Sequence, residues 1–497
     1  MTNKTLLYGV FAVMTALMSL STLNSCKKSD KDEPIETYST SIQTTLVKAF
    51  GLQADNDVLT SLDSVYFTVD YDNGLIYNAD SLPVGTDISA LKVRIDFYNT
   101  VNSAVFNISG ATVQSDTAIN YTSSMSTALD FTGKTVLTVT SYDKTRVKDY
   151  QIMVLVHKEN PDSLKWSQSW RRDLPGLSAQ TKAFKVVRQG DLYRAMSFDG
   201  NGCNLMTAAA PDASWTNQQA NVPFEPQIAS LTATPHNLFM LDNTGELWIS
   251  PDGMAWTDCG VKWHSLLGSY EDRALGIITD GTAYSHDEYP RSDNFEPTAV
   301  EDGFPIAHSS DMIVTDNKWA VTQQAIIVGG MDAKGHLVSD VWGYDGSNWG
   351  KINNIHSSVL PALADATLFP YYTFKSLSGV RRYARQSTWY VMGGKLADGT
   401  LNSKIYMSNT EGITWTVGDS TICQPSFMPC FYGAQAMVAN ETLTLGGAAN
   451  GPRRVQALIT SWDCPFIYLF GGYNDRGELL PSVWRGVYNR LTNAPVY

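Results

Sequence analysis

The sequence predicts an all-β protein that consists of a small β-sandwich followed by a β-propeller. Residues 40–158 contain short apolar or alternating runs of strand length, and the C-terminal two-thirds of the chain carries an internal repeat. The composition agrees, because 37 glycines, 13 tryptophans and 24 tyrosines among 497 residues are typical of a β protein that is rich in turns.

The N-terminus has the layout of a secretory signal, in which Lys4 precedes a mostly apolar stretch that ends near Thr22. The next four residues, Leu23–Cys26, resemble the bacterial lipobox, where a small residue stands directly before a lipidated cysteine. We therefore expect residues 1–25 to be a lipoprotein signal peptide and Cys26 to carry the lipid that holds the protein to a membrane. An ordinary signal peptide that happens to end near a cysteine is the alternative.

Residues 26–39 begin with a charged stretch, Lys27–Pro34, that has no apolar side chain able to join a core. We interpret residues 26–39 as an acidic and polar tether. Its acidic residues close to Cys26 resemble the export signal of Bacteroidota surface lipoproteins. This resemblance implies a lipid anchor in the outer membrane, with the protein facing the cell exterior. A linker that is merely solvated is the alternative.

The charge of the chain excludes one class of partner. The formal net charge is −13, and removing the signal peptide with Lys4 and no acid changes it to −14. We expect no nucleic acid partner, because binding a polyphosphate requires a basic face and no lysine- and arginine-rich run follows the tether.

The five cysteines that remain after Cys26 are an odd number, and none forms a Cys-x-x-Cys pair. We therefore expect no zinc site of this type. Cys423 and Cys430 could form a disulfide in an oxidising compartment, and isolated thiols are the equal alternative.

Residues 40–158 read as one β-sandwich. Four runs have strand length and turn residues between them: Val65–Val69, Val93–Tyr98, Val136–Thr140 and Tyr150–Val156. The last two resemble the final hairpin of the immunoglobulin-like domains of Bacteroidota surface lipoproteins, which implies an immunoglobulin-like spacer. Charge and a proline interrupt the pattern at Lys158–Asp162, so we expect residues 159–181 to be a linker.

The remainder, residues 182–497, carries the repeat. Three turns share an acid, a glycine, two variable positions and a tryptophan; their shared residues are Asp252, Gly253 and Trp256, then Asp345, Gly346 and Trp349, then Glu411, Gly412 and Trp415. The carboxylate can accept hydrogen bonds from turn amides, and glycine tolerates positive φ. Two of these turns also resemble the Asp-box of sialidase-like propellers, a structural turn.

Apolar strands that end in a glycine doublet form the second part of the repeat. The doublets are Gly329–Gly330, Gly393–Gly394 and Gly471–Gly472, and an aromatic strand follows each of them. Together with the tryptophan turns they resemble the kelch repeat, which implies a kelch-like β-propeller. Blades beginning near Leu192, Leu238, Leu275, Ile326, Tyr390 and Phe466 give six, with seven as the alternative because of a fourth doublet at Gly446–Gly447. We expect Phe184–Val187, or the residues near Val496, to close the ring.

Two arginine pairs occupy matching places in the repeat. Arg381–Arg382 precede one glycine doublet and Arg453–Arg454 precede the next, so both pairs should lie in turns between the first and second strands of adjacent blades. Since arginine binds carboxylates bidentately, this end of the channel could receive an anionic sugar or a peptide carboxylate. Pairing with local acids is the alternative.

No motif in the sequence indicates a reaction. The seven histidines are dispersed, and the chain has no nucleophile elbow, phosphate-binding loop or dinucleotide fingerprint. We therefore expect no catalytic residue, metal or cofactor.

The whole organisation resembles an uncharacterised family of Bacteroidota surface lipoproteins. Our hypothesis is a noncatalytic module that binds a glycan or an envelope protein through the propeller loops. A glycan-active propeller enzyme of the mutarotase, epimerase or glycosidase type is the first alternative. A structural role in an outer-membrane complex is the second.

Overall fold

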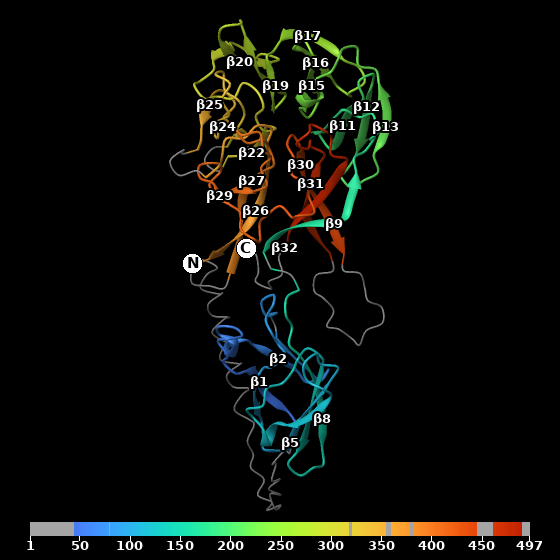
Figure 1. The fold of residues 1–497 in the computed structure, drawn as a ribbon, viewed down its shortest axis with the longest axis vertical. Coiled ribbons are helices and arrows are strands. Elements are labelled where there is room, and N and C mark those ends of the chain that lie inside the picture. Colours follow the sequence, from blue (N-terminus) through green and yellow to red (C-terminus); the bar gives the residue numbers. More distant parts are fainter. Residues whose placement is uncertain are drawn as a thin grey trace, which may run out of the picture. The chain divides into compact units, whose positions relative to one another are not determined.

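A computed structural model describes residues 44–78, 80–158, 160, 162–317, 321–353, 359–377, 382–444 and 461–489. Strands dominate the described chain, and its helices are three single 3-10 turns, η1 (Leu62–Ser64), η2 (Tyr121–Ser123) and η3 (Ile228–Ser230) (Figure 1). The all-β prediction is confirmed. Within the described ranges, no helix has the length and apolar character needed to cross a membrane. Cys26 and the predicted tether lie outside the described residues.

The chain divides into two compact units. The N-terminal unit comprises Met1–Ala79 and Asp87–Val154, and the C-terminal unit comprises Asp80–Thr86 and Leu155–Tyr497.

The N-terminal unit contains two sheets. In the smaller sheet, β1 (Val47–Leu52) pairs antiparallel with β4 (Val93–Phe97). The larger sheet has the strand order β2-β3-β8-β7-β5-β6, and only its β3–β8 pair is parallel. Its strands are β2 (Phe67–Asp70), β3 (Leu75–Asn78), β5 (Val101–Ser109), β6 (Thr117–Asn120), β7 (Lys134–Ser141) and β8 (Val147–Met153).

The core of this unit follows from the period-two pattern of its strands. In β7, buried and more exposed side chains alternate along the whole strand, as expected where one face of a sheet packs on the core. Two edge-to-face pairs fill the interior, with ring centroids 5.0 Å apart for Phe50 and Phe67 and 6.0 Å apart for Phe106 and Tyr121. The four predicted runs fall on β2, β4, β7 and β8. The immunoglobulin-like type stays a prediction.

The described residues of the C-terminal unit form six four-stranded antiparallel sheets. Five of them follow the chain order, from the channel strand outward. They are β10 (Ala183–Gln189), β11 (Leu192–Phe198), β12 (Cys203–Ala208) and β13 (Thr216–Ala220); β14 (Thr232–Ala233), β15 (Leu238–Leu241), β16 (Glu246–Ser250) and β17 (Thr257–Lys262); β18 (Ser265–Tyr270), β19 (Arg273–Thr279), β20 (Tyr284–Tyr289) and β21 (Thr298–Ala299); β22 (Ile313–Asp316), β23 (Gln323–Val328), β24 (Val341–Tyr344) and β25 (Trp349–Lys351); β26 (Thr367–Leu377), β27 (Arg382–Met392), β28 (Tyr406–Ser408) and β29 (Thr416–Val417).

The sixth sheet closes the ring with a strand from the start of the unit. It has the order β30-β31-β32-β9, formed by β30 (Gln435–Thr444), β31 (Ser461–Phe470), β32 (Ser482–Asn489) and β9 (Ser163–Asp173). The predicted linker, residues 159–181, therefore contains the closing strand. Our expectation for Phe184–Val187 is wrong, because these residues belong to β10 of the first sheet. Residues near Val496 lie outside the described residues.

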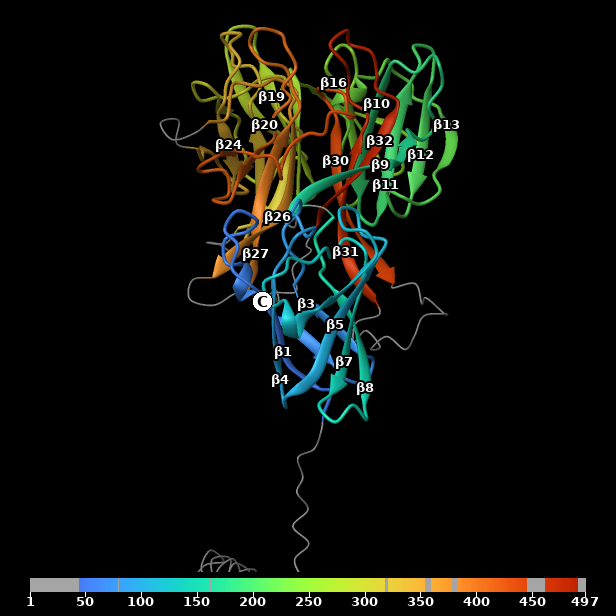
Figure 2. The same cartoon turned by 60° about the horizontal axis from the view of Figure 1, so that its bottom comes forward.

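The six predicted blade starts fall on β11, β15, β19, β23, β27 and β31, each the second strand of its sheet. These strands are apolar because neighbouring sheets cover both of their faces, and all four residues of Leu238–Leu241 are at most 1 % exposed. The first strands β10, β14, β18, β22, β26 and β30 instead line the central channel. Figure 2 shows that the hairpins β26–β27 and β30–β31 extend beyond the shorter strands of the other sheets.

Candidate functional site: the mouth of the propeller channel

The channel is hollow and has two ends that differ in structure. A cavity of about 690 Å³ follows the channel and is lined from all six sheets. A second cavity of about 340 Å³ lies at one end, which we call the doublet mouth because the glycine doublets and the loops before the first strands meet there. The hairpins between first and second strands and the tryptophan turns lie at the other end, which we call the hairpin end.

Three equivalent loops form one side of the doublet mouth. His308, Asp365 and Gly433 precede β22, β26 and β30, and each has a left-handed backbone with φ of 57°, 51° and 66°. The amide of Asp365 donates to the carbonyl of His308 at 2.7 Å, and the amide of Gly433 donates to the carbonyl of Asp365 at 2.8 Å. Three neighbouring sheets are thereby held together at the cavity.

The predicted glycine doublets pack against these loops. Gly330 donates its amide to the carbonyl of Leu363 at 2.7 Å, and Gly394 donates to that of Phe431 at 2.8 Å, so these two doublets contact the loop of the next sheet. A Cβ atom on Gly330 would lie 2.6 Å from Pro305. All six residues of the three doublets have positive φ, including Gly329, Gly393, Gly471 and Gly472. The doublets therefore have a structural role at the mouth.

An imidazole and a carboxylate form a pair on the rim of the cavity. Nδ1 of His308 lies 3.0 Å from Oδ1 and 3.1 Å from Oδ2 of Asp365. This hydrogen bond raises the pKa of His308 above its ordinary value, although burial acts in the opposite direction. The pair is therefore a charged contact in acidic solution.

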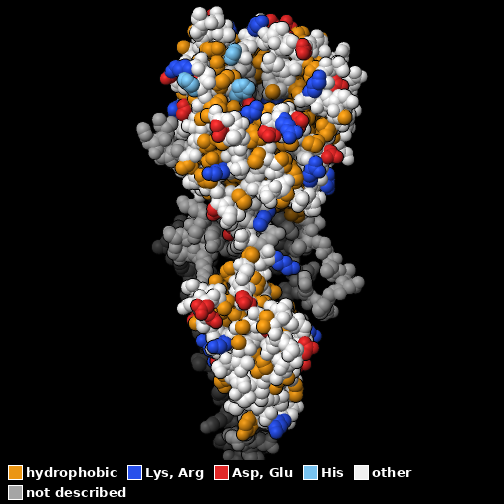
Figure 3. Space-filling view, viewed as in Figure 1, with side chains coloured by type: hydrophobic (Ala, Val, Ile, Leu, Met, Phe, Trp, Pro, Cys, Tyr) orange, Lys and Arg blue, Asp and Glu red, His pale blue; other side chains and the backbone are white. Residues whose placement is uncertain are grey.

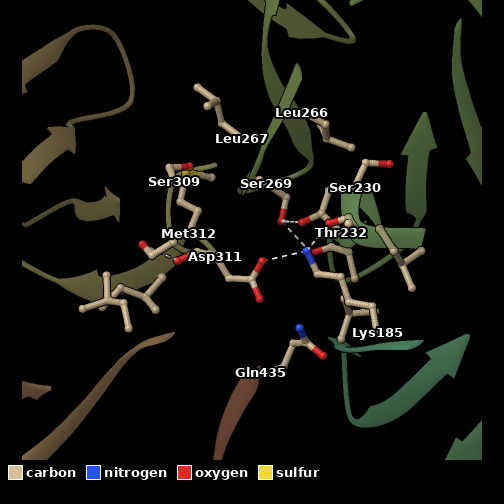
Figure 4. Close-up of a pocket in the computed structure, with 18 of the residues that line it drawn as sticks. Lys185, Ser230, Thr232, Leu266, Leu267, Ser269, Ser309, Asp311, Met312 and Gln435 are labelled. Atoms are coloured by element: carbon tan, nitrogen blue, oxygen red, sulfur yellow. Dashed lines mark hydrogen bonds and ion pairs between the residues drawn. The ribbon is translucent and has the colours of Figure 1, made fainter. Parts of the chain in front are cut away.

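A lysine and an aspartate meet inside the mouth. Lys185 projects from β10, and its Nζ lies 2.6 Å from Oδ1 of Asp311 and 2.7 Å from the carbonyl oxygen of Ala229 (Figure 4). Both side chains line both cavities. The pair thus lies between the mouth and the rest of the channel.

Aromatic and amide groups complete the mouth cavity. Tyr432 and Tyr473 line it, with ring centroids 5.5 Å apart, and the Nζ atom of Lys395 lies 3.5 Å from the Tyr432 ring centroid. Burial raises the pKa of Tyr473. Gln435 donates its Nε2 to the carbonyl of Gly433 at 2.7 Å, while its Oε1 is buried and has no hydrogen-bond partner among the described residues.

The three predicted tryptophan turns lie at the hairpin end, where each joins the third and fourth strands of a sheet. Asp252 and Asp345 each accept two backbone hydrogen bonds at 2.8–3.0 Å. The indoles of Trp256 and Trp415 donate to the carbonyls of Gly253 and Gly412. Glu411 departs from the two aspartates by having φ of 53°, and there Ser408 accepts the Gly412 amide at 2.9 Å. In the remaining turn Gly346 has φ of 100°, and Trp349 packs on Phe304 and Tyr344. These contacts are structural.

The predicted arginine site is only partly described. Arg381, Arg453 and Arg454 lie outside the described residues, and Arg382 is described only as the first residue of β27, paired with Leu377. The strands that flank the two pairs, β26 with β27 and β30 with β31, are the first and second strands of adjacent sheets. They lead to the hairpin end, away from the mouth cavity.

Two further observations concern thiols and metals. Cys423 and Cys430 are free, as are Cys203, Cys259 and Cys464, so no disulfide joins them. Within the described part of the chain, no three His, Cys, Asp or Glu side chains gather to hold a metal ion.

Sequence reasoning missed the residues that line the mouth, among them Lys185, His308, Asp311, Asp365 and Gln435. Lys185 and Asp311 are 126 positions apart in the chain, and no motif connects them. The sequence signal for these residues is a strand before each predicted blade start. That signal is weak, because polar residues interrupt the apolar pattern of these strands.

Charged side chains are mixed on the one face of the molecule that Figure 3 shows. On the face of the described chain shown in Figure 3, acidic and basic side chains are scattered among apolar and neutral ones, and no broad basic patch is visible. This agrees with the net charge of −13.

Comparison with solved structures finds distant similarity. A structure of YjhT is 11% identical with a TM-score of 0.37, covering 62% of this chain and 95% of that chain. YCF48 from Cyanidioschyzon merolae is 12% identical with a TM-score of 0.29, covering 78% and 97%. A structure of YCF48 bound to D1 peptide is 14% identical with a TM-score of 0.27, covering 73% and 90%. A search of curated proteins finds no match.

Family models match both units of the chain. The model of the DUF6242 N-terminal domain, a domain of unknown function, matches residues 35–154. The model of the DUF6242 beta propeller domain matches residues 160–496, which confirms the predicted propeller. The second match begins before β9, so it includes the closing strand. The chain therefore belongs to the DUF6242 family, with the N-terminal domain and the β-propeller domain of that family in one polypeptide.

Proposed function

We propose that the propeller is a noncatalytic module that binds a saccharide at the doublet mouth, and that an acylated Cys26 holds the protein on the outer membrane. One observation carries the binding proposal. Tyr432 and Tyr473 line the same cavity of about 340 Å³ as the polar side chains of Lys185, Asp311 and Gln435. This volume is near the lower end of the range of small-molecule sites, roughly 300–1,000 Å³, and suits one or two sugar rings.

The chemistry of the cavity matches that of a sugar. Tyrosine rings offer flat apolar faces to the C–H groups of a pyranose, and a tyrosine has few rotatable bonds to immobilise. Amide and ammonium groups, such as those of Gln435 and Lys185, make directional hydrogen bonds with hydroxyls. The unpartnered Oε1 of Gln435 is an acceptor that a ligand hydroxyl would satisfy.

The ion-pair partners of the carboxylates of Asp311 and Asp365 favour a binding role over glycoside hydrolysis. A glycosidase uses two carboxyl groups that flank the scissile bond, one of them protonated to act as an acid. Here Asp311 is paired with Lys185 and Asp365 with His308. Both carboxylates are thus held by a lysine or histidine side chain, at 2.6 Å for Asp311 and 3.0 Å for Asp365, and do not stand free on either side of a substrate. These roles suit recognition.

Binding of the full-length chain to a glycan array, followed by calorimetric titration, tests this proposal. We expect Tyr473→Ala and Tyr432→Ala each to weaken binding about tenfold, which corresponds to roughly 1.4 kcal/mol. Tyr142→Ala is the matched control, because this tyrosine lies on the N-terminal unit and is 64% exposed.

Two results would contradict the proposal. One is the absence of binding to every saccharide. The other is binding that the two mouth variants retain unchanged while their thermal unfolding shows that they are folded.

A further inference from the structure

The Lys185–Asp311 pair spans the channel. Lys185 belongs to the first sheet, and Asp311 precedes β22 of the fourth sheet. In a ring of six sheets the first and fourth stand opposite each other, so the 2.6 Å contact between Nζ and Oδ1 joins opposite walls. Figure 4 shows the two side chains pointing toward each other, with Gln435 beside them.

The two partners differ in how much water they meet. The side chain of Lys185 is 11% exposed, whereas that of Asp311 is 43% exposed. A buried ammonium that loses its counter-ion suffers a large desolvation penalty, whereas a half-exposed carboxylate that is released returns to water. Asp311 is therefore the exchangeable member of the pair, and Lys185 requires an anion in its place.

This asymmetry selects the charge of a ligand. A cationic ligand would have to take Asp311 and leave Lys185 buried without an anion. A neutral ligand would have to bind around the intact pair. An anionic ligand can replace Asp311 at Lys185 and leave every buried charge compensated.

We propose that Lys185 is the anion-recognition residue of the mouth, and that the site takes an acidic saccharide whose carboxylate displaces Asp311. The proposal rests on the saccharide binding proposed above and specifies its ligand class. Gln435 provides the second point of contact, because its Nε2 is committed to the carbonyl of Gly433 and its buried Oε1, which has no partner among the described residues, can accept from a ligand hydroxyl. A carboxylate and a hydroxyl on one sugar ring satisfy both residues.

Calorimetric titration of the full-length chain with matched pairs of sugars tests the proposal. The probes are D-glucuronic acid with D-glucose and D-galacturonic acid with D-galactose. We expect at least one acid to bind ten times or more tightly than its parent hexose. Asp311→Asn should raise the affinity for that acid several-fold, because the variant removes the competing carboxylate. Lys185→Met should abolish the preference for the acid.

A second ion pair provides the control. Lys334 and Asp302 form a surface pair with side chains 62% and 84% exposed, and neither residue lines either of the two channel cavities. Lys334→Met and Asp302→Asn should leave both affinities unchanged. The unfolding temperatures of all four variants show whether each is folded. If Lys185→Met does not fold, the affinity of Asp311→Asn for the acid still tests the proposal.

The outcomes separate the two proposals. Neutral hexoses that bind as tightly as their acids would overturn the acidic ligand and leave saccharide binding intact. A folded Asp311→Asn variant that binds the acid less tightly would also overturn it, because Asp311 would then contact the ligand. If neither acids nor hexoses bind, the acidic ligand is overturned, and the glycan array decides separately whether saccharide binding fails.

Discussion

At the scale of single residues, the mouth is built from side chains that satisfy one another across blades. His308 pairs with Asp365 of the next sheet, and Lys185 pairs with Asp311 of the opposite sheet. Each residue alone is an ordinary loop or strand residue in the sequence. Their role at the mouth depends on partners 57 and 126 positions away in the chain, and no local sequence pattern indicates such partners.

The His308–Asp365 pair predicts a pH dependence of stability. Because the pKa of His308 is raised in the folded protein, the protonated imidazole stabilises the fold. This contribution is complete below the unfolded pKa, about 6.5, and is lost as the pH rises through the folded pKa. We expect Asp365→Asn to lower the unfolding temperature more at pH 5.5 than at pH 8.5, measured by circular dichroism.

The matched control for this prediction is a histidine pair with longer contacts. His336 lies 4.0 Å from Asp332, and its side chain is 76% exposed. His336→Gln should not alter the pH dependence. An Asp365→Asn effect of equal size at both pH values would show that the carboxylate acts without the charge of His308.

At the scale of elements, the sequence predicts the buried second strands well and the other strands less well. A strand such as Leu238–Leu241 is covered on both faces, so its apolar run is visible in the sequence. The channel strands face a cavity with both polar and apolar lining and carry mixed residues, as in Gln435–Thr444, and β14 has only two residues. The closing strand, Ser163–Asp173, contains five charged or amide residues and follows a proline, which made it resemble a linker.

The closing strand contains a position at which we expect a substitution to destabilise the ring strongly. Trp166 of β9 is 8% exposed and packs against Gly486 of β32, where a Cβ atom would lie 2.8 Å from the indole. Trp166→Ala should lower the free energy of unfolding of the propeller by about 3–5 kcal/mol, because it leaves a cavity in the sheet that closes the ring. Denaturant unfolding followed by tryptophan fluorescence measures this loss.

A neighbour on the same strand gives the control. Lys165 directly precedes Trp166 in β9 and is partly exposed. Lys165→Ala should therefore change the free energy of unfolding by less than about 0.5 kcal/mol. A Trp166→Ala variant as stable as the parent would show that β9 contributes little to ring closure.

At the scale of the whole molecule, the chain combines a predicted lipid anchor with a proposed binding site in a closed ring. Sequence reasoning reached the all-β class and the propeller because repeats and apolar strands are local signals. It placed its candidate site on arginines at the hairpin end, whereas the smaller of the two cavities, with the cluster of polar and tyrosine side chains, lies at the doublet mouth. The mouth is assembled from loops of different blades, so its residues converge only after the ring has closed.

The predicted anchor requires that Cys26, one of six cysteines in the chain, carries acyl chains. If Cys26 is acylated, full-length protein made in a bacterial host should incorporate labelled palmitate and fractionate with membranes, since two or more acyl chains give stable attachment. Cys26→Ala should lose both properties. Cys423→Ala should keep both and is the proper control, because Cys423 is exposed, whereas burial raises the pKa of Cys203 to about 11 and so disfavours its reactive thiolate. Label that persists in Cys26→Ala would place the lipid on another residue and remove the basis for a surface-anchored propeller.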